Sequence, residues 1–103
     1  MSNRLETLKS MVEQNPNDSF ARYGLAMEYA NSGQLDEAVA AYRALLDVNP
    51  DYAAGYYHGA RTLEKLGKID EARAMYEKGI EVTTRTGDMH TRSELQAALD
   101  ILG

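Results

Sequence analysis

The chain has 103 residues, the length of one small domain, and its lack of cysteine excludes disulfides and thiolate chemistry. A formal net charge of -5 argues against nucleic acid as a partner, because phosphate binding rests on a surplus of lysine and arginine. No apolar stretch approaches the length of a membrane span, and the first residues lack the apolar core of a signal peptide, so we expect a small stand-alone protein in the cytoplasm, without membrane contact.

The first predicted helix covers residues 3–14, because apolar residues recur there at helical spacing. These residues are Leu5, Leu8, Met11 and Val12. Asn15-Pro16 ends the helix, since proline disfavours helical backbone in the residue before it. The same dipeptide recurs as Asn49-Pro50 after a later helix, so residues 1–17 are expected to form a flanking helix that corresponds to the second member of a helix pair.

The next two predicted helices cover residues 18–32 and 35–48 and are joined by a tight turn. Asn17 or Asp18 is the expected N-cap of the first of them, and Gly33 fits the left-handed position that ends it. The second carries an amphipathic stripe at i, i+4, i+7 and i+8, formed by Ala38, Tyr42, Leu45 and Leu46. A helix, a turn and an antiparallel helix are therefore expected in this part of the chain.

The same pattern returns 34 residues later and predicts helices over residues 52–66 and 69–84. Asp51 is the expected N-cap of the first, and Gly67 is expected to end it as Gly33 ends its counterpart. Further identical pairs lie at the same offset: Tyr23 and Tyr57, Ala26 and Ala60, Tyr42 and Tyr76, and Val48 and Val82. The chain is therefore divided into two repeats, at residues 18–52 and 53–86.

The last predicted helix covers residues 89–102 and belongs to a capping segment, residues 87–103. Its apolar stripe at i, i+3, i+4 and i+7 consists of Leu95, Ala98, Leu99 and Leu102. We expect residues 83–86 to form the loop before it, with phosphorylation of this threonine-rich segment as the alternative. Six helices in one domain of residues 1–103 result.

The 34-residue unit resembles the tetratricopeptide repeat, whose signature combines an aromatic residue, Leu-Gly and Tyr with a later Ala, Phe and Pro. Matching residues are Leu25, Ala26, Tyr29, Ala38, Tyr42 and Pro50 in the first repeat and Tyr56, Ala60, Leu63, Ala72 and Tyr76 in the second. Arg22, Gly59 and Thr84 depart from it: Gly59 predicts a small void or a close helix approach, and Thr84 lets its helix pass the usual proline stop. The resemblance covers residues 15–86 and implies an all-α fold, a right-handed superhelical stack of antiparallel helix pairs (an α-solenoid).

The resemblance also implies a non-catalytic adaptor that binds a protein or peptide in a concave groove lined by the first helix of each repeat. The expected groove residues are Tyr23, Met27, Tyr57, His58, Arg61, Lys65 and His90. Some members of the family hold a C-terminal carboxylate with a Lys and Asn clamp, but this chain has Tyr23, Met27, His58 and Arg61 at the matching places, so that function is not carried over. The groove is instead expected to be aromatic and mildly basic, suited to a ligand with acidic and apolar residues.

Other interpretations of these residues stay open. Arg61, Lys65 and His58 could form a weak anion site or be ordinary exposed polar residues, and His58 and His90 are expected on the same concave side. Tyr29, Tyr42, Tyr56 and Tyr76 are expected in the core. No motif for catalysis or for a resident metal or cofactor occurs. Self-association into a homodimer through an exposed terminal helix is the alternative function.

Overall fold

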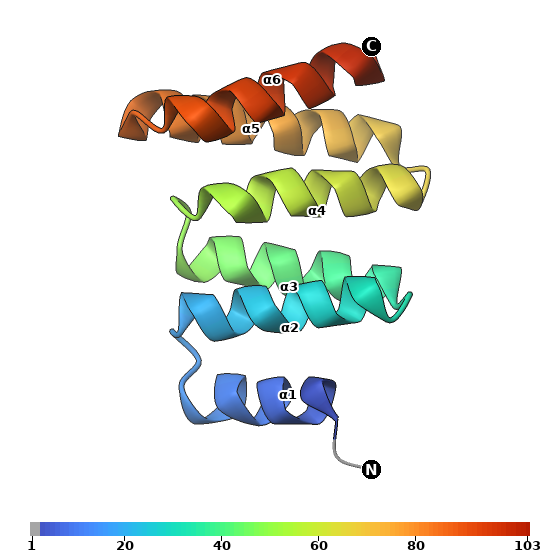
Figure 1. Cartoon of the computed structure of the whole chain (residues 1–103), viewed down its shortest axis with the longest axis vertical. Coiled ribbons are helices and arrows are strands. Elements are labelled where there is room, and N and C mark those ends of the chain that lie inside the picture. Colours follow the sequence, from blue (N-terminus) through green and yellow to red (C-terminus); the bar gives the residue numbers. More distant parts are fainter. Residues whose placement is uncertain (1–2) are drawn as a thin grey trace.

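The computed structural model describes residues 3–103, which form six α-helices joined by short turns (Figure 1). In chain order the helices are α1 (Arg4–Gln14), α2 (Ser19–Asn31), α3 (Leu35–Val48), α4 (Ala53–Lys65), α5 (Ile69–Thr86) and α6 (Met89–Leu102). Every boundary lies within two residues of the sequence-based expectation, and no strand occurs between residues 3 and 103. The all-α prediction is confirmed; residues 1 and 2 of the predicted flanking segment lie outside the described part.

The helices pack in sequential antiparallel pairs along the longest axis of the molecule, which measures 42 Å (Figure 1). α2 pairs with α3 and α4 with α5, and α6 packs on both α5 and α4. α1 packs mainly on α2. The two ends of the stack are therefore built differently, with a helix that has one main neighbour at one end and a helix that has two at the other.

The first helix of each pair is followed by one glycine, Gly33 after α2 and Gly67 after α4. Gly33 and Gly67 have φ angles of 79° and 77°, a left-handed backbone that costs other residues energy. In the first turn the Gln34 N–H donates to the Tyr29 carbonyl at 2.9 Å, and the second turn repeats this bond. These bonds satisfy carbonyls that the end of the helix leaves free, as the sequence predicted.

The N-cap predicted for α2 is confirmed, and the N-cap predicted for α4 is wrong. The Asp18 side chain accepts a hydrogen bond from the Ala21 N–H at 3.1 Å and caps α2. Asp51 does not cap α4, because Tyr52 occupies the N-cap position and its side chain makes no capping bond. Asp51 instead accepts a hydrogen bond from Arg85 at 2.5 Å, and this bond holds the pKa of the Asp51 carboxyl below its usual value.

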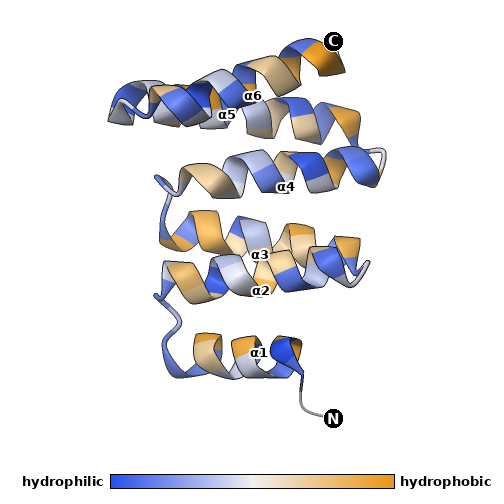
Figure 2. Ribbon diagram, in the orientation of Figure 1, coloured by the Kyte–Doolittle hydropathy of each residue, from blue (hydrophilic) through white to orange (hydrophobic). Residues whose placement is uncertain are grey.

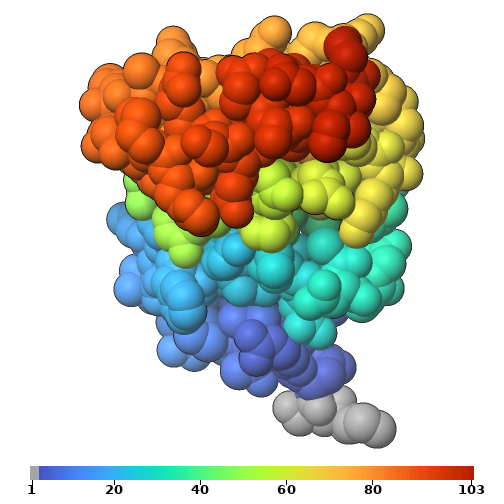
Figure 3. All heavy atoms as spheres, turned by 45° about the horizontal axis from the view of Figure 1, so that its top comes forward, coloured from blue at the N-terminus to red at the C-terminus, as the bar shows by residue number. Residues whose placement is uncertain are grey.

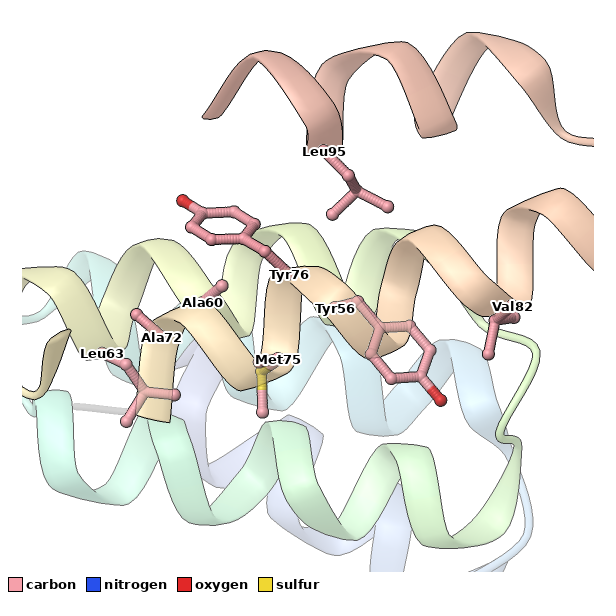
Figure 4. Packing of buried hydrophobic residues seen from close by; sticks show 8 residues of the cluster. All are labelled: Tyr56, Ala60, Leu63, Ala72, Met75, Tyr76, Val82 and Leu95. Atoms are coloured by element: carbon pink, nitrogen blue, oxygen red, sulfur yellow. The ribbon is translucent and has the colours of Figure 1, made fainter. Parts of the chain in front are cut away.

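The core consists of two clusters, one for each helix pair. The first is formed by Ala26, Ala38, Tyr42 and Leu45, all at most 1% exposed. The second joins α4, α5 and α6 (Figure 4) and contains Tyr56, Ala60, Leu63, Ala72, Met75, Tyr76, Val82 and Leu95. Three of the four tyrosines expected in the core are buried there, whereas Tyr29 is half-buried and carries the Lys9 ammonium 5.8 Å from its ring centre.

Glycines let α4 and α5 pack closely. A Cβ atom at Gly59 would lie 2.6 Å from the Met75 sulfur and 3.3 Å from the Tyr42 Cβ. A Cβ atom at Gly79 would lie 2.7 Å from the Tyr56 Cβ. Both distances to the nearest atom are shorter than a carbon atom allows, so of the two possibilities for Gly59 the structure has the close approach and not the void.

α5 extends further than predicted. It ends at Thr86, and the expectation that residues 83–86 form a loop is wrong. Thr84 stands where the family signature has proline, and threonine keeps its N–H and permits helical backbone in the residue before it. Thr83 is fully buried and its hydroxyl donates to the Gly79 carbonyl at 2.8 Å. The last turns of α5 therefore contribute to the core.

α6 packs against α5 and α4 at the far end of the stack. Its Leu95 is fully buried and points toward Tyr56 and Tyr76 (Figure 4), with the other residues of the stripe packed around the same cluster. In Figure 2 the apolar residues of α1, at the opposite end, lie on the side of the helix that faces α2. No helix within residues 3–103 is long and apolar enough to cross a membrane.

Candidate functional site

One face of the stack is formed by the first helices of the repeats and the cap, α2, α4 and α6, and we refer to it as the inner face. Figure 1 shows α2 in front of α3 and α6 in front of α5. Figure 3 shows the same three helices on one surface, with α6 in red, α4 in green to yellow and α2 in blue to cyan. Because α2 and α4 share a register at an offset of 34 residues, they present equivalent positions to this surface.

An aromatic run crosses the inner face from the start of α4 over α2 and back to α4. It consists of Tyr52, Tyr23, His58 and Tyr57. The Tyr52 and Tyr23 ring centres are 5.2 Å apart, and those of Tyr23 and His58 are 5.9 Å apart. His58 and Tyr57 meet edge to face at 5.2 Å, and all four side chains are half-buried. The fold thus brings together three of the predicted groove residues from two helices.

Arg61 extends this run along α4. Its Nη1 donates to the Tyr57 hydroxyl at 2.9 Å, and its guanidinium carbon lies 5.7 Å from the Tyr57 ring centre. The two residues are one helical turn apart, which is the spacing that puts side chains in contact. The hydrogen bond that Arg61 donates to Tyr57 raises the pKa of Arg61, so the side chain is a permanent cation. A guanidinium has five N–H donors, and a carboxylate can accept two of them at once.

His58 is neutral at neutral pH. Burial lowers the pKa of its imidazole, the charge of Arg61 lowers it further, and Glu94 of α6 acts in the opposite direction. The lowered pKa of His58 therefore disfavours a positive charge from this residue in the weak anion site considered for Arg61, Lys65 and His58. The position is better described as a half-buried aromatic ring between two tyrosines.

A groove of about 380 Å³ separates α4 from α6 on the inner face. It is lined by Tyr57, Arg61, Glu64, Glu94, Ala97, Ala98 and Ile101. Glu64 also accepts a short hydrogen bond from the buried Tyr76 hydroxyl, which fixes one wall. Two carboxylates beside one guanidinium make this groove mixed in charge, so the expectation of a mildly basic groove is wrong here.

The other predicted groove residues are more dispersed. Lys65 is exposed one turn beyond Arg61. His90 is exposed near the start of α6, with its Nε2 3.7 Å from a Glu94 oxygen. Glu94 thus lies beside His90, and its charge also raises the pKa of His58. Within residues 3–103 no three side chains of the His, Cys, Asp and Glu types are grouped so as to hold a metal ion.

Tyr23 and Met27 also line a second groove, of about 270 Å³, between α1 and α2. We refer to it as the end groove, and its apolar lining consists of Leu8, Met11, Phe20, Ala21, Tyr23 and Met27. The Met27 side chain is held in place by the core, because the hydroxyl of the buried Tyr42 donates a hydrogen bond to its sulfur at 3.0 Å. The predicted groove residues are therefore shared between two sites rather than lined up in one.

Sequence reasoning missed the α6 wall of the α4/α6 groove. Glu94, Ala97 and Ile101 follow one another at three and four residues, so they share a helix face. That face differs from the apolar stripe that contains Leu95, and a search for helix faces beyond the core stripe would have found it. Glu64 lies three residues after Arg61 on the same face and could have been found in the same way.

A third groove, of about 460 Å³, lies between α3 and α5. Arg43 of α3 and Glu71 of α5 both line it and form an ion pair at 2.9 Å between their side chains. It contains none of the predicted groove residues. Although it is larger, it brings together no aromatic run, and we do not assign a function to it.

Comparisons with known proteins agree with this geometry. The family model described as tetratricopeptide repeat matches residues 23–83, which is more than half of the chain. The chain belongs to the tetratricopeptide repeat family. Repeat domains of this family are typically non-catalytic. A search of curated proteins gave no match.

Solved structures support the same assignment. A tetratricopeptide repeat domain protein from Salinibacter ruber is 36% identical, with 85% of this chain and 89% of that chain covered and a TM-score of 0.80. A protein from Bordetella parapertussis is 31% identical over 99% of this chain and 89% of that chain, with a TM-score of 0.84. The TPR2B domain of yeast Sti1, in complex with pHsp70, is 13% identical over 95% of this chain and 78% of that chain, with a TM-score of 0.88, and shares the fold.

Proposed function

We propose that this chain is a non-catalytic adaptor that binds a protein segment or peptide on its inner face, with the α4/α6 groove as the main contact. The observation that carries the proposal is the continuity of the aromatic run with Arg61 at the edge of that groove. Tyrosine offers a large contact area at low entropic cost, and arginine adds directional recognition of a carboxylate.

The ligand that fits best has both apolar and acidic side chains. Apolar side chains of the ligand can pack between Tyr57 and Ile101, since the latter is 87% exposed. A carboxylate of the ligand would pair with Arg61, whereas a basic side chain would pair with Glu64 or Glu94. The acidic group should therefore lie on the Arg61 side, and its neighbours should be apolar rather than acidic.

Peptide binding by a relative supports the general class. The Sti1 domain was solved with pHsp70, and it has the same arrangement of helices as this chain. Its low identity carries no residue-level information, so the ligand chemistry proposed above rests on the side chains of the inner face alone. The cytoplasm is the compartment that we propose for such an adaptor.

The test is selection of binders from a displayed library of short random peptides, followed by calorimetric titration of the selected peptides. We expect acidic and apolar residues to be enriched among them. Arg61→Glu should weaken their binding at least tenfold, or by about 1.4 kcal/mol, because it removes a charge-assisted contact and adds a third carboxylate beside Glu64 and Glu94.

The matched control is Lys68→Glu, which makes the same change of charge at an exposed position of the turn before α5. It should change the affinity less than twofold, or by about 0.4 kcal/mol. Arg43 is less suitable because it pairs with Glu71. Equal losses in Arg61→Glu and Lys68→Glu would show that the net charge, and not the inner face, governs binding, and the proposal would then fail.

A further inference from the structure

His58 is the residue of the aromatic run whose charge can change near neutral pH, because a tyrosine side chain releases its proton only at about pH 10. It lies on α4 with the Tyr23 ring centre 5.9 Å away and the Tyr57 ring centre 5.2 Å away, and it is half-buried. Arg61 follows three residues later on the same helix, and side chains at that spacing are neighbours. The imidazole therefore lies next to the guanidinium that pairs with a ligand carboxylate in the proposed function.

The charged groups around His58 come from two helices. α4 lies between α2 and α6 on the inner face (Figure 3). Burial is the largest effect and lowers the pKa of the imidazole, Arg61 of α4 lowers it further, and Glu94 of α6 raises it. Tyr23 of α2 contributes an uncharged ring, and within residues 3–103 no charged group of α3 or α5 acts on His58. The free protein therefore favours the neutral imidazole, and a carboxylate that arrives beside Arg61 changes this balance.

We propose that binding of a ligand carboxylate at Arg61 is coupled to the uptake of one proton by His58, so that the inner face holds an acidic ligand more tightly at mildly acidic pH. The coupling rests on the proposed function, because it concerns the regulation of the same site. The carboxylate offsets the charge of Arg61 and attracts the imidazolium directly. The buffer supplies the proton, which binds to the unprotonated ring nitrogen of His58. Because such coupling is reciprocal, the ligand favours the protonated ring as much as the protonated ring favours the ligand.

The position of His58 beside the α4/α6 groove, and not in it, gives the coupling its sign. The imidazole does not line the groove, whereas Tyr57, which it meets edge to face, does. A ligand that fills the groove therefore leaves the water around His58 in place, and only the charge of the ligand reaches the ring. A ligand that covered the imidazole would have the opposite effect, since the loss of water favours the neutral form.

His90 is the matched control for His58. Its side chain is 87% exposed, its Nε2 lies 3.7 Å from a Glu94 oxygen, and it does not line the groove. Water screens its charge, so a carboxylate at Arg61 acts on it more weakly than on His58. The chain has two histidines, so replacing each in turn assigns the uptake of a proton near neutral pH to one of them.

The experiment is calorimetric titration of the full chain with acetyl-Ala-Leu-Glu-Leu-Ala-amide, a peptide whose blocked ends leave glutamate as its single ionisable group. The glutamate is ionised at both about pH 5.5 and about pH 7.5, because its ordinary pKa is about 4.3, and histidine is the side chain that titrates between these values. We expect the affinity to be at least about threefold higher at the lower pH, within the limit of about tenfold per pH unit that one proton sets. Titrations in two buffers with different heats of ionisation should show the uptake of up to one proton.

Two variants and a second peptide assign the effect. His58→Gln should bind the peptide with the same affinity at both pH values, whereas His90→Gln should keep the full response. The peptide with glutamine in place of glutamate should show no response with the unaltered chain, because it brings no charge to Arg61. Circular dichroism at both pH values should show that each protein stays folded.

Three results would overturn the coupling. They are an affinity that is equal at the two pH values, an affinity that is lower at the acidic one, and a response that persists in His58→Gln. Peptide binding that Arg61→Glu weakens but that does not depend on pH would remove the coupling alone and leave the adaptor function in place. Absence of peptide binding at both pH values would contradict both.

Discussion

The two ends of this molecule contain the same kind of element, a single amphipathic helix, but they finish the stack differently. At the C-terminal end α6 packs on two helices, and its Leu95 is fully buried. At the N-terminal end α1 packs mainly on one helix, its Leu8 is 8% exposed, and Met11 beside it is 42% exposed. One end is closed by its own helix and the other leaves an apolar groove.

The difference follows from which member of a helix pair stands last. A first helix, such as α6, contacts both helices of the preceding pair, so one helix is enough to cover the core. Within residues 3–103 a second helix, such as α1, contacts mainly the first helix that follows it, and its other side stays uncovered by the helices described. In the described part of the chain, the packing of a terminal helix therefore depends on whether it is the first or the second helix of a pair, and not on hydrophobicity alone.

Truncation of one core leucine at each end should give the largest effect and measures this difference directly. Leu95→Ala should lower the free energy of unfolding by about 2–5 kcal/mol, because it opens a cavity in a fully enclosed cluster. Leu8→Ala should cost less than half as much, since its surroundings can relax toward the end groove and water. Urea unfolding followed by circular dichroism gives both values, and an equal or larger cost for Leu8→Ala would show that the ends are equally well packed.

Overpacking inside the two repeats should give an intermediate effect that is the same in both. Ala38 and Ala72 are fully buried at equivalent positions, each between the helices of its own pair. Replacing either by leucine should cost about 1–3 kcal/mol because the helices would have to move apart. Melting temperatures that differ widely between Ala38→Leu and Ala72→Leu would mean that the repeats themselves differ, and not only the ends.

The smallest expected effect is the pH dependence of stability that His58 causes, at the place where the aromatic run meets α6. Because burial lowers the pKa of His58, folding favours the neutral imidazole, so its contribution is present above pH 6.5 and is lost as the pH falls below that value. The groups that face it are Tyr23 of α2, Tyr57 and Arg61 of α4, and Glu94 of α6.

His58→Gln should remove that part of the acid sensitivity. The slope due to His58 cannot exceed about 1.4 kcal/mol per pH unit, the value for one proton. The check is urea unfolding of both proteins at several pH values between 5 and 7. A difference in stability between them that does not change with pH would contradict a half-buried His58 that folding keeps neutral.

Most of the fold could be predicted from the sequence because the evidence was local and repeated. Gly33 and Gly67 mark the turns, and the apolar stripes mark the helices, so all six helices lie where the spacing placed them. Asp51 was misassigned because its carboxylate has a second use in the ion pair with Arg85, 34 residues away. The end of α5 was misjudged because the absence of a proline allows the helix to continue but does not determine the residue at which it ends.

The candidate site was less predictable, because it depends on how α6 sits against α4. The spacing within α4 placed Tyr57 next to Arg61, and the repeat placed Tyr23 on the neighbouring helix. Two carboxylates share the groove with Arg61. One of them belongs to Glu94, a residue of α6 that lies outside the 34-residue repeats. The 34-residue offset therefore could not predict it.

Amide hydrogen exchange at Leu8 and Leu95, the core leucines of the two ends, tests most directly the claim that one end of the stack is open and the other closed. Both amides lie inside helices, so their exchange reports the opening of α1 and of α6. Leu8 should exchange at least tenfold faster than Leu95, a difference of about 1.4 kcal/mol in the free energy of opening. Equal exchange at the two positions, or faster exchange at Leu95, would contradict the account.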